Sequence, residues 1–160
     1  MNLEEELVVG IIDDDLTPDT PHGRAMNRII HGLSEFGITV YTIQSIEGAR
    51  SAYANLPEAD CIIINWDMGD DPTHTGAHHL IGEIRERNED IPIFLMAEPV
   101  QESFATIPVG MLKEIDEFVY IMDDTPEFIA GRITAAANRY KERLLPPFFG
   151  GLVKFSKDFE

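Results

Sequence analysis

The chain has 160 residues, of which 44% are hydrophobic, and this length fits one domain with a sizeable apolar core and a short tail. Twelve Lys and Arg residues stand against 29 Asp and Glu residues, which gives a formal net charge of −17. This charge repels phosphate backbones and anionic lipid surfaces, so neither a nucleic acid nor a membrane is an expected partner.

The first part of the chain alternates apolar strands with an amphipathic helix. Leu7–Ile12 is an apolar run that predicts a strand, and three consecutive aspartates at 13–15 end it. A capping residue, Pro21 in the first turn and apolar residues at helical spacing then predict a helix that ends at Gly37. Alternating apolar and polar residues predict a second strand over Ile38–Ile43.

The middle of the chain repeats this order. Ser45 can cap a short helix that closes before Pro57. In the stretch 59–69, an acidic residue, four apolar residues rich in Ile and then polar residues with Gly predict a strand buried on both faces. An amphipathic pattern predicts a helix over 78–88, and an apolar run predicts a fourth strand over 91–96.

The last third is less regular. The stretch 99–114 contains Pro108 and Gly110 and predicts an irregular or broken helix. A fifth short strand is expected over 118–122, and a last helix is expected from Pro126 to about residue 145. Together these elements predict an α/β fold, a five-stranded parallel sheet in the order 2-1-3-4-5 with helices on both faces, flavodoxin-like in architecture.

The C-terminal tail has a different character from this domain. Residues 1–145 are expected to form the domain, and Pro146 and Pro147 must stop its last helix. The tail that follows is more apolar than a free chain end, so it is expected to begin a linker to a further domain or a contact with a partner chain. The interaction candidates in the tail are Phe148, Phe149, Leu152 and Phe155.

The end of the third strand, residues 65–69, resembles the Asp-Trp-x-Met-Pro sequence that closes the third strand of response-regulator receiver domains. In those domains the leading Asp accepts a phosphoryl group, whereas the amide of Asn65 is a poor nucleophile and a poor magnesium ligand. The resemblance implies an acidic pair after the first strand and a Ser or Thr after the fourth, where this chain has Ala97. Asp67 remains a conceivable displaced acceptor. The sequence thus predicts a receiver-like fold with a degenerate pocket made of Asp13, Asp14, Asn65, Asp67 and Ala97.

Two further groups of residues are candidate sites. His74, His78 and His79 have a spacing that can bring imidazoles together, but Gly76 interrupts the turn and no cysteine completes a tetrahedral set, so a solvated helix start is the favoured interpretation. Cys61 lies inside an apolar strand and is expected to be a small buried hydrophobe. No catalytic, cofactor-binding or metal-binding residue is therefore expected.

The run 116–132, with its continuations at 139–140 and 144–149, closely resembles the end of the N-terminal wing domain of bacterial inducible Orn/Lys/Arg decarboxylases, and it is most similar to the arginine-specific branch. The resemblance implies a receiver-like wing that precedes a linker, a pyridoxal-phosphate domain and a C-terminal domain. It also implies that wings pack together and assemble dimers into a decamer. The Schiff-base lysine and the pyridoxal-binding residues would lie beyond Glu160, in the remainder of the parent enzyme.

The expected function is therefore a non-catalytic oligomerisation and regulatory domain of a decarboxylase for arginine, lysine or ornithine that acts in the acid-stress response. The acidic excess is either a solubilising surface or a pH switch, because protonation of carboxylates and of the five histidines would lift charge repulsion between copies.

Two alternatives stay open. One is a stand-alone, phosphorylation-incompetent pseudo-receiver that binds a signalling partner through its helix-four and strand-five face. The other is small-ligand regulation, with Arg85, Arg87 and Arg132 as candidate phosphate contacts. Residues 1–6 lack the features of a signal peptide and no apolar run approaches ~20 residues, so a cytoplasmic location is expected.

Overall fold

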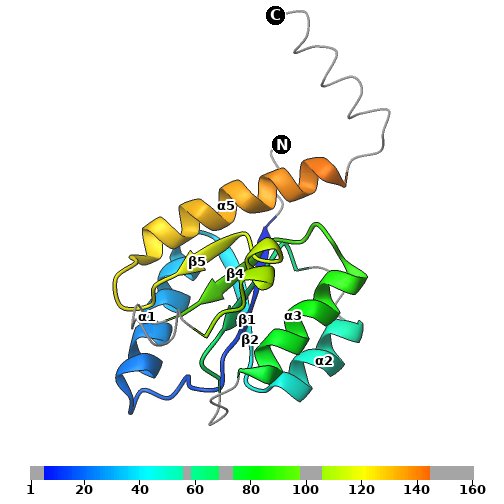
Figure 1. Cartoon of the computed structure of the whole chain (residues 1–160). Helices are drawn as coiled ribbons and strands as arrows, with labels where there is room; N and C mark the ends of the chain where they lie inside the picture. Colours follow the sequence, from blue (N-terminus) through cyan, green and yellow to red (C-terminus); the bar gives the residue numbers. More distant parts are fainter. Residues whose placement is uncertain (1–5, 56–58, 69–73, 98–105, 145–160) are drawn as a thin grey trace, which may run out of the picture.

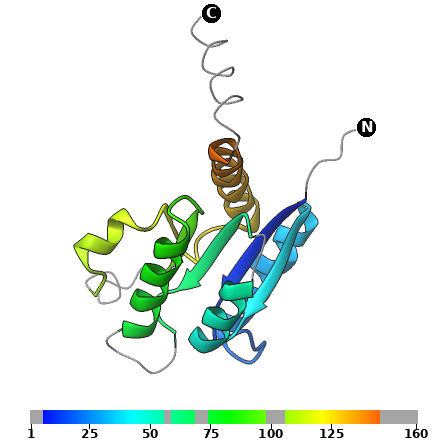
Figure 2. The same ribbon diagram turned by 90° about the vertical axis from the view of Figure 1, so that its right-hand side faces the viewer.

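The structure is a computed structural model that describes residues 6–55, 59–68, 74–97 and 106–144. A five-stranded sheet lies between two layers of helices, with α1 and α5 on one face and α2 and α3 on the other (Figures 1 and 2). The elements in chain order are β1 (Leu7–Ile12), α1 (Pro21–Glu35), β2 (Ile38–Ile43), α2 (Ile46–Asn55), β3 (Cys61–Asn65), α3 (Thr75–Arg87), β4 (Ile93–Met96), the 3₁₀ helix η1 (Val109–Lys113), β5 (Glu117–Val119) and α5 (Pro126–Arg143).

The sheet confirms the predicted topology. All neighbouring strands are parallel, and their order is β2-β1-β3-β4-β5. The carboxyl ends of the strands therefore meet at one edge of the sheet, which places the residues after β1, β3 and β4 close together. Ligand and catalytic sites of open parallel sheets usually lie at this edge.

The core explains why β3 and β4 are apolar at almost every position. Ile63 packs into the cluster under α1 and α5, whereas its neighbours Ile62 and Ile64 pack into the cluster under α2 and α3. Every residue of both strands is buried. Burying a side chain of this size contributes about 1.5–3 kcal/mol.

The same capping signal starts the two helices that share a face. Thr20 precedes Pro21 and its hydroxyl accepts a hydrogen bond from the backbone N–H of Gly23, at 2.9 Å. Thr125 precedes Pro126 and accepts one from Phe128 N–H, at 3.2 Å. A β-region cap followed by proline is pre-organised for the first helical turn, and this confirms both predicted starts.

The predicted fifth strand over 118–122 was placed too late. β5 ends at Val119, and the chain then turns because the N–H groups of Asp123 and Asp124 both donate to the carbonyl of Tyr120. The Asp124 carboxylate also accepts a hydrogen bond from Tyr120 N–H at 2.9 Å, which closes the turn. Ile121 is fully buried, so its hydrophobicity reflects packing in this turn rather than a strand.

Other boundaries shift by a few residues. β4 begins after Pro92, which has no N–H group to donate although its carbonyl accepts a hydrogen bond from Ile62 N–H at 2.9 Å. α3 begins at Thr75, three residues before the predicted start. The irregular stretch contains the short helix η1, while its beginning, 98–105, lies outside the described residues. The tail 145–160 and its aromatic candidates also lie outside them. None of the helices in the described part of the chain combines the length and apolarity that crossing a membrane requires.

Candidate functional site

Asp13 and Asn65 meet at the carboxyl edge of the sheet. Asp13 follows β1 and Asn65 is the last residue of the adjacent strand β3, and the Asn65 amide nitrogen Nδ2 donates to Asp13 Oδ1 at 3.0 Å. The backbone N–H of Asp15 donates to the same oxygen at 3.1 Å. Asp13 is 0% exposed and Asn65 is 5% exposed, so the contact is shielded from water. The structure thus brings together two residues that the sequence placed in one degenerate pocket.

The second oxygen of Asp13 is held by His22, from the first turn of α1. His22 Nε2 lies 2.6 Å from Asp13 Oδ2, and the imidazole is 17% exposed. A buried carboxylate is costly unless it is hydrogen-bonded or paired with a positive group, and an imidazole N–H supplies a donor that can also carry charge. His22 was not identified from the sequence. A single histidine nine positions after an aspartate gives no sign that the intervening loop will bring its imidazole next to the Asp13 carboxylate.

The remaining pocket residues do not complete a reactive site. Asn65 Oδ1 accepts a hydrogen bond from Asp67 N–H at 3.0 Å, which fixes the amide with its nitrogen toward Asp13. Asp14 is exposed, and Ala97 is a buried methyl group whose N–H donates to the Val119 carbonyl. Within the described ranges, no three His, Cys, Asp or Glu side chains are arranged to hold a metal ion. In the described residues these contacts hold the ends of β1 and β3 together.

Trp66 anchors the turn after β3. Its ring is 1% exposed and stacks on the His74 imidazole, with centroids 4.8 Å apart and an interplanar angle of 8°. The indole N–H donates to Thr106 Oγ1 at 2.9 Å, and His74 Nδ1 lies 2.8 Å from the Trp66 carbonyl oxygen. His74 holds the left-handed backbone conformation with φ of 54° at the start of α3, and these contacts offset its strain.

The three candidate histidines do not act as one cluster. His74 packs against Trp66, while His78 and His79 are exposed on α3, with ring centroids 6.2 Å apart. Cys61 lies in the centre of the sheet as expected, and burial raises the pKa of its thiol above the ordinary range, with a smaller contribution from the carboxylates of Asp116 and Asp60. A thiol in this environment is not a nucleophile at neutral pH.

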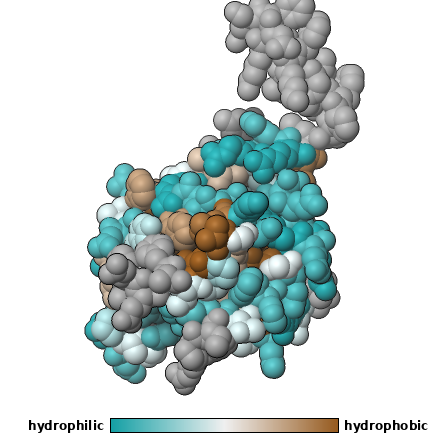
Figure 3. All heavy atoms as spheres, viewed as in Figure 1, coloured by the Kyte–Doolittle hydropathy of each residue, from teal (hydrophilic) through white to brown (hydrophobic). Residues whose placement is uncertain are grey.

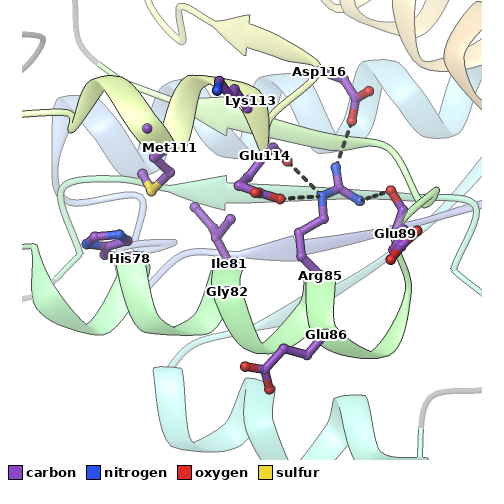
Figure 4. A pocket seen from close by; sticks show the side chains of 11 residues that line it. His78, Ile81, Gly82, Arg85, Glu86, Glu89, Met111, Lys113, Glu114 and Asp116 are labelled. Atoms are coloured by element: carbon purple, nitrogen blue, oxygen red, sulfur yellow. Dashed lines mark hydrogen bonds and ion pairs between the residues drawn. The ribbon is translucent and has the colours of Figure 1, made fainter.

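A groove between α3 and η1 is organised around Arg85 (Figure 4). The guanidinium is 13% exposed and donates to the carbonyls of Ile91, at 2.6 Å, and Glu114, at 2.8 Å. It also donates to Asp116 Oδ2 at 3.1 Å, and this carboxylate accepts Ile93 N–H at 2.8 Å. Arg85 therefore joins α3 to the loops on both sides of β4, and its donors are used inside the protein.

Arg132 is similarly occupied. It pairs with Glu117 of the edge strand, its Nη1 lies 3.7 Å from Asp124 Oδ2, and its guanidinium lies over the rings of Phe94 and Phe128 at 5.7 and 5.3 Å. Internal partners thus engage two of the three arginines that the small-ligand hypothesis named, and this weakens that hypothesis.

Exposed apolar side chains gather on the face that carries η1, β5 and the start of α5, here called the η1–β5–α5 face. Figure 3 shows hydrophobic residues at the centre of this face, below α5. The large apolar side chains most open to solvent on it are Val109 (80%), Phe128 (56%), Leu112 (46%) and Met122 (46%). Exposed apolar side chains that lie together are a feature of protein–protein contacts, so this face is a candidate contact.

Comparison with known proteins places these features in context. The model of a family described as Orn/Lys/Arg decarboxylase, N-terminal domain, matches residues 21–140. The biodegradative arginine decarboxylase of Escherichia coli strain K12 is 34% identical over 141 residues, which cover 88% of this chain and 18% of that protein.

Solved structures agree with this match. The lysine decarboxylase A of Pseudomonas aeruginosa superposes with a TM-score of 0.73 at 26% identity and covers 96% of this chain and 21% of its own. A response regulator receiver domain from Clostridium thermocellum has a TM-score of 0.62 at 20% identity, covers 84% of this chain and 97% of its own, and supports the receiver-like fold alone.

Proposed function

Because this chain belongs to the Orn/Lys/Arg decarboxylase N-terminal domain family, we propose that it is the non-catalytic assembly and regulatory domain of a basic amino acid decarboxylase. The family match over residues 21–140 carries the proposal, since it spans most of the described fold. The chain spans about a fifth of the length of its decarboxylase relatives, so the reaction is assigned to the rest of a longer polypeptide. Arginine is the proposed substrate, because the match to an arginine decarboxylase is the closer of the two at 34% against 27% identity.

The proposed cofactor of that longer protein is pyridoxal phosphate. The described lysines of this domain are not placed to hold it. A pyridoxal enzyme holds the cofactor through a lysine within a site that protects the reacting groups. Both described lysines, Lys113 and Lys141, lie at the surface, and Lys141 is 3.9 Å from Asp60. The proposed pyridoxal site therefore lies outside the described residues.

The η1–β5–α5 face is the proposed contact for self-association. Its exposed apolar side chains would gain about 25 cal/mol for each Å² removed from water, which favours burial against another copy. A single small contact of this kind is weak, and repetition around a ring of dimers strengthens it. In this proposal the domain helps to assemble dimers into a decamer.

Acid is proposed to favour this assembly. At neutral pH the net charge of −17 makes copies repel each other, and protonation of carboxylates and histidines reduces the repulsion. All five histidines lie in the described chain, and His31 sits 3.2 Å from Glu35 on the exposed face of α1. Such a response suits a cytoplasmic enzyme of the acid-stress response. Association that is unchanged between about pH 7.5 and about pH 5.5 contradicts this part of the proposal.

The deciding experiment uses the natural polypeptide that contains this sequence, purified from its own cells. A mass several times 18.0 kDa, visible absorbance from a pyridoxal group and a large assembly that shrinks when residues 1–145 are deleted support the proposal. An assembly that keeps its size after the deletion contradicts it.

The second candidate function is a stand-alone pseudo-receiver that binds a signalling protein. The specific observation in its favour is the likeness to single receiver domains, which this chain matches over 97% of their length. A colourless polypeptide that ends near residue 160 would support this candidate and contradict the first.

A further inference from the structure

The outer side of α5 carries a stripe of residues that makes little contact within the chain. Glu127, Phe128, Gly131, Ala135 and Arg139 lie at helical spacing and are all exposed. They line one side of a shallow groove of about 560 Å³ that continues toward the η1–β5–α5 face. The groove is therefore a helix face with two small residues at its centre and a longer side chain at each end.

Nothing within the described chain explains the glycine in this stripe. A Cβ atom at Gly131 would meet no atom within 4 Å, so an alanine would fit. Glycine in a helix interior costs about 1 kcal/mol relative to alanine. A small residue at this position does have a use when a second helix approaches closely, because the distance between packed helix axes, about 8–10 Å, depends on the side chains at the contact.

The charged ends of the stripe are also unpaired. Neither Glu127 nor Arg139 makes a hydrogen bond or an ion pair with any residue of the described chain. Glu127 and Arg139 are twelve positions apart, about 18 Å along the helix, so they cannot reach each other within one chain.

The spacing of these residues is self-complementary. Two copies of α5 can cross antiparallel about a two-fold axis that passes midway between positions 131 and 135. Each residue then lies opposite the residue of the second copy that is the same number of positions from this midpoint, in the other direction along the sequence. Gly131 then faces Ala135 of the second copy, and Glu127 faces Arg139 of the second copy, about 9 Å from the axis. The symmetry produces each of these pairs twice, and both charged pairs have opposite signs.

We propose that two copies of this chain associate through antiparallel α5 helices, with Gly131 and Ala135 at the crossing and two Glu127–Arg139 ion pairs at its ends. This inference rests on the proposed function: it narrows the contact proposed above for the η1–β5–α5 face to its α5 side, where Phe128 lies, and names a second copy of this chain as the partner. The complementarity of the contact lies in the two Glu127–Arg139 pairs, since both copies present the same helix.

Phe128 adds apolar area to this contact. In the antiparallel register it lies opposite Asn138 and beside Arg139 of the second copy, and its ring is 56% exposed in one chain. The contact remains small compared with a stable dimer interface of about 1,600 Å², so a weak association that repetition reinforces is expected.

The test measures self-association of the 160-residue chain by sedimentation equilibrium up to about 1 mM. Glu127→Arg and Arg139→Glu each turn two attractive pairs into repulsive ones and are expected to lower the association constant roughly tenfold. The double variant restores opposite charges and is expected to return to within about threefold of the wild type. Circular dichroism checks that each variant keeps its helices.

A steric pair of variants provides the second readout. Gly131→Leu blocks the crossing and is expected to abolish association, while Gly82→Leu on α3 is the matched control, because a Cβ at Gly82 also meets no atom within 4 Å. Wild type that stays monomeric at about 1 mM, a double variant without recovery, or equal effects of the two leucines would each overturn the α5 contact. If the α5 variants leave the assembly of the longer polypeptide intact and deletion of residues 1–145 disrupts it, the inference fails and the proposed function stands.

Discussion

Asn65→Asp tests most directly how the carboxyl edge of the sheet is held together. In the native chain the amide nitrogen of Asn65 donates to Asp13 Oδ1 at 3.0 Å, and Asp13 is 0% exposed. The substitution removes this donor and sets a second carboxylate against a buried one, with no change in size. His22 and the N–H of Asp15 remain as partners of Asp13.

Two terms set the size of the effect. A lost hydrogen bond to a charged group costs about 1.5–3 kcal/mol. The repulsion between the two carboxylates cannot exceed the free energy needed to protonate one of them, because protonation removes the repulsion. For an ordinary aspartate, with a pKa of about 3.9, protonation costs about 4 kcal/mol at pH 7 and about 1.5 kcal/mol at pH 5. Because a proton shared by the pair makes a new hydrogen bond, a net loss of about 2–4 kcal/mol is expected at pH 7.

The sign of the pH dependence follows from the same linkage. The folded variant binds a proton more tightly than the unfolded chain does, so the pKa of the pair is raised on folding and stability is gained as pH falls. Relative to the wild type at each pH, the loss is expected to shrink by about 2 kcal/mol between pH 7 and pH 5.

Urea unfolding followed by the fluorescence of Trp66, the single tryptophan, measures this difference. Gln44→Glu is the matched control, because it adds the same charge at an exposed position just after β2, at the same edge of the sheet. The control is expected to change stability by less than about 0.5 kcal/mol. Equal losses in the two variants, or a loss in Asn65→Asp that does not depend on pH, would refute the reasoning.

Three further predictions follow from the described contacts. Arg85→Lys loses several donors to backbone carbonyls and is expected to lower the unfolding free energy by about 2–3 kcal/mol in urea, whereas the exposed Arg87→Lys changes it by less than about 0.5 kcal/mol. Trp66 emission is expected to change in His74→Ala, because the imidazole that stacks on the buried indole is lost; identical emission of the two native proteins contradicts the stack. Cys61 is expected to react with a thiol reagent only on unfolding, because burial raises its thiol pKa, and prompt reaction of the native chain contradicts this.

The fold could be predicted because its strongest signals are local. Consecutive apolar residues in β3 and β4 reflect burial on both faces, and the Thr-Pro pairs before α1 and α5 mark helix starts. The fifth strand was misplaced for a related reason. Ile121 is as buried as a strand residue, but it reaches the core from a turn, and hydrophobicity alone does not distinguish these two cases.

The site could be predicted only where it depends on topology. Asp13 directly follows β1 and Asn65 ends the adjacent parallel strand β3, so their proximity follows from the sheet order. The contact of His22 depends on the conformation of the loop that precedes α1, and the contacts of Arg85 depend on the direction of backbone carbonyl oxygens. Residue type alone predicts neither the loop conformation nor the carbonyl directions. The pairing of Trp66 with His74 likewise depends on one left-handed residue that sequence patterns do not indicate.

The same residues support the proposal that this receiver-like fold serves assembly and not phosphotransfer. A receiver senses phosphorylation through a charged site that changes at the carboxyl edge of the sheet, and here that edge is closed by Asn65 and His22 on a buried carboxylate. With this edge fixed, a change of state must come from the surface, where charge and apolar area are available. Pairs such as Glu127 and Arg139, which have no partner in the described chain, are positioned to respond to another copy, and the core need not change for such a contact to form.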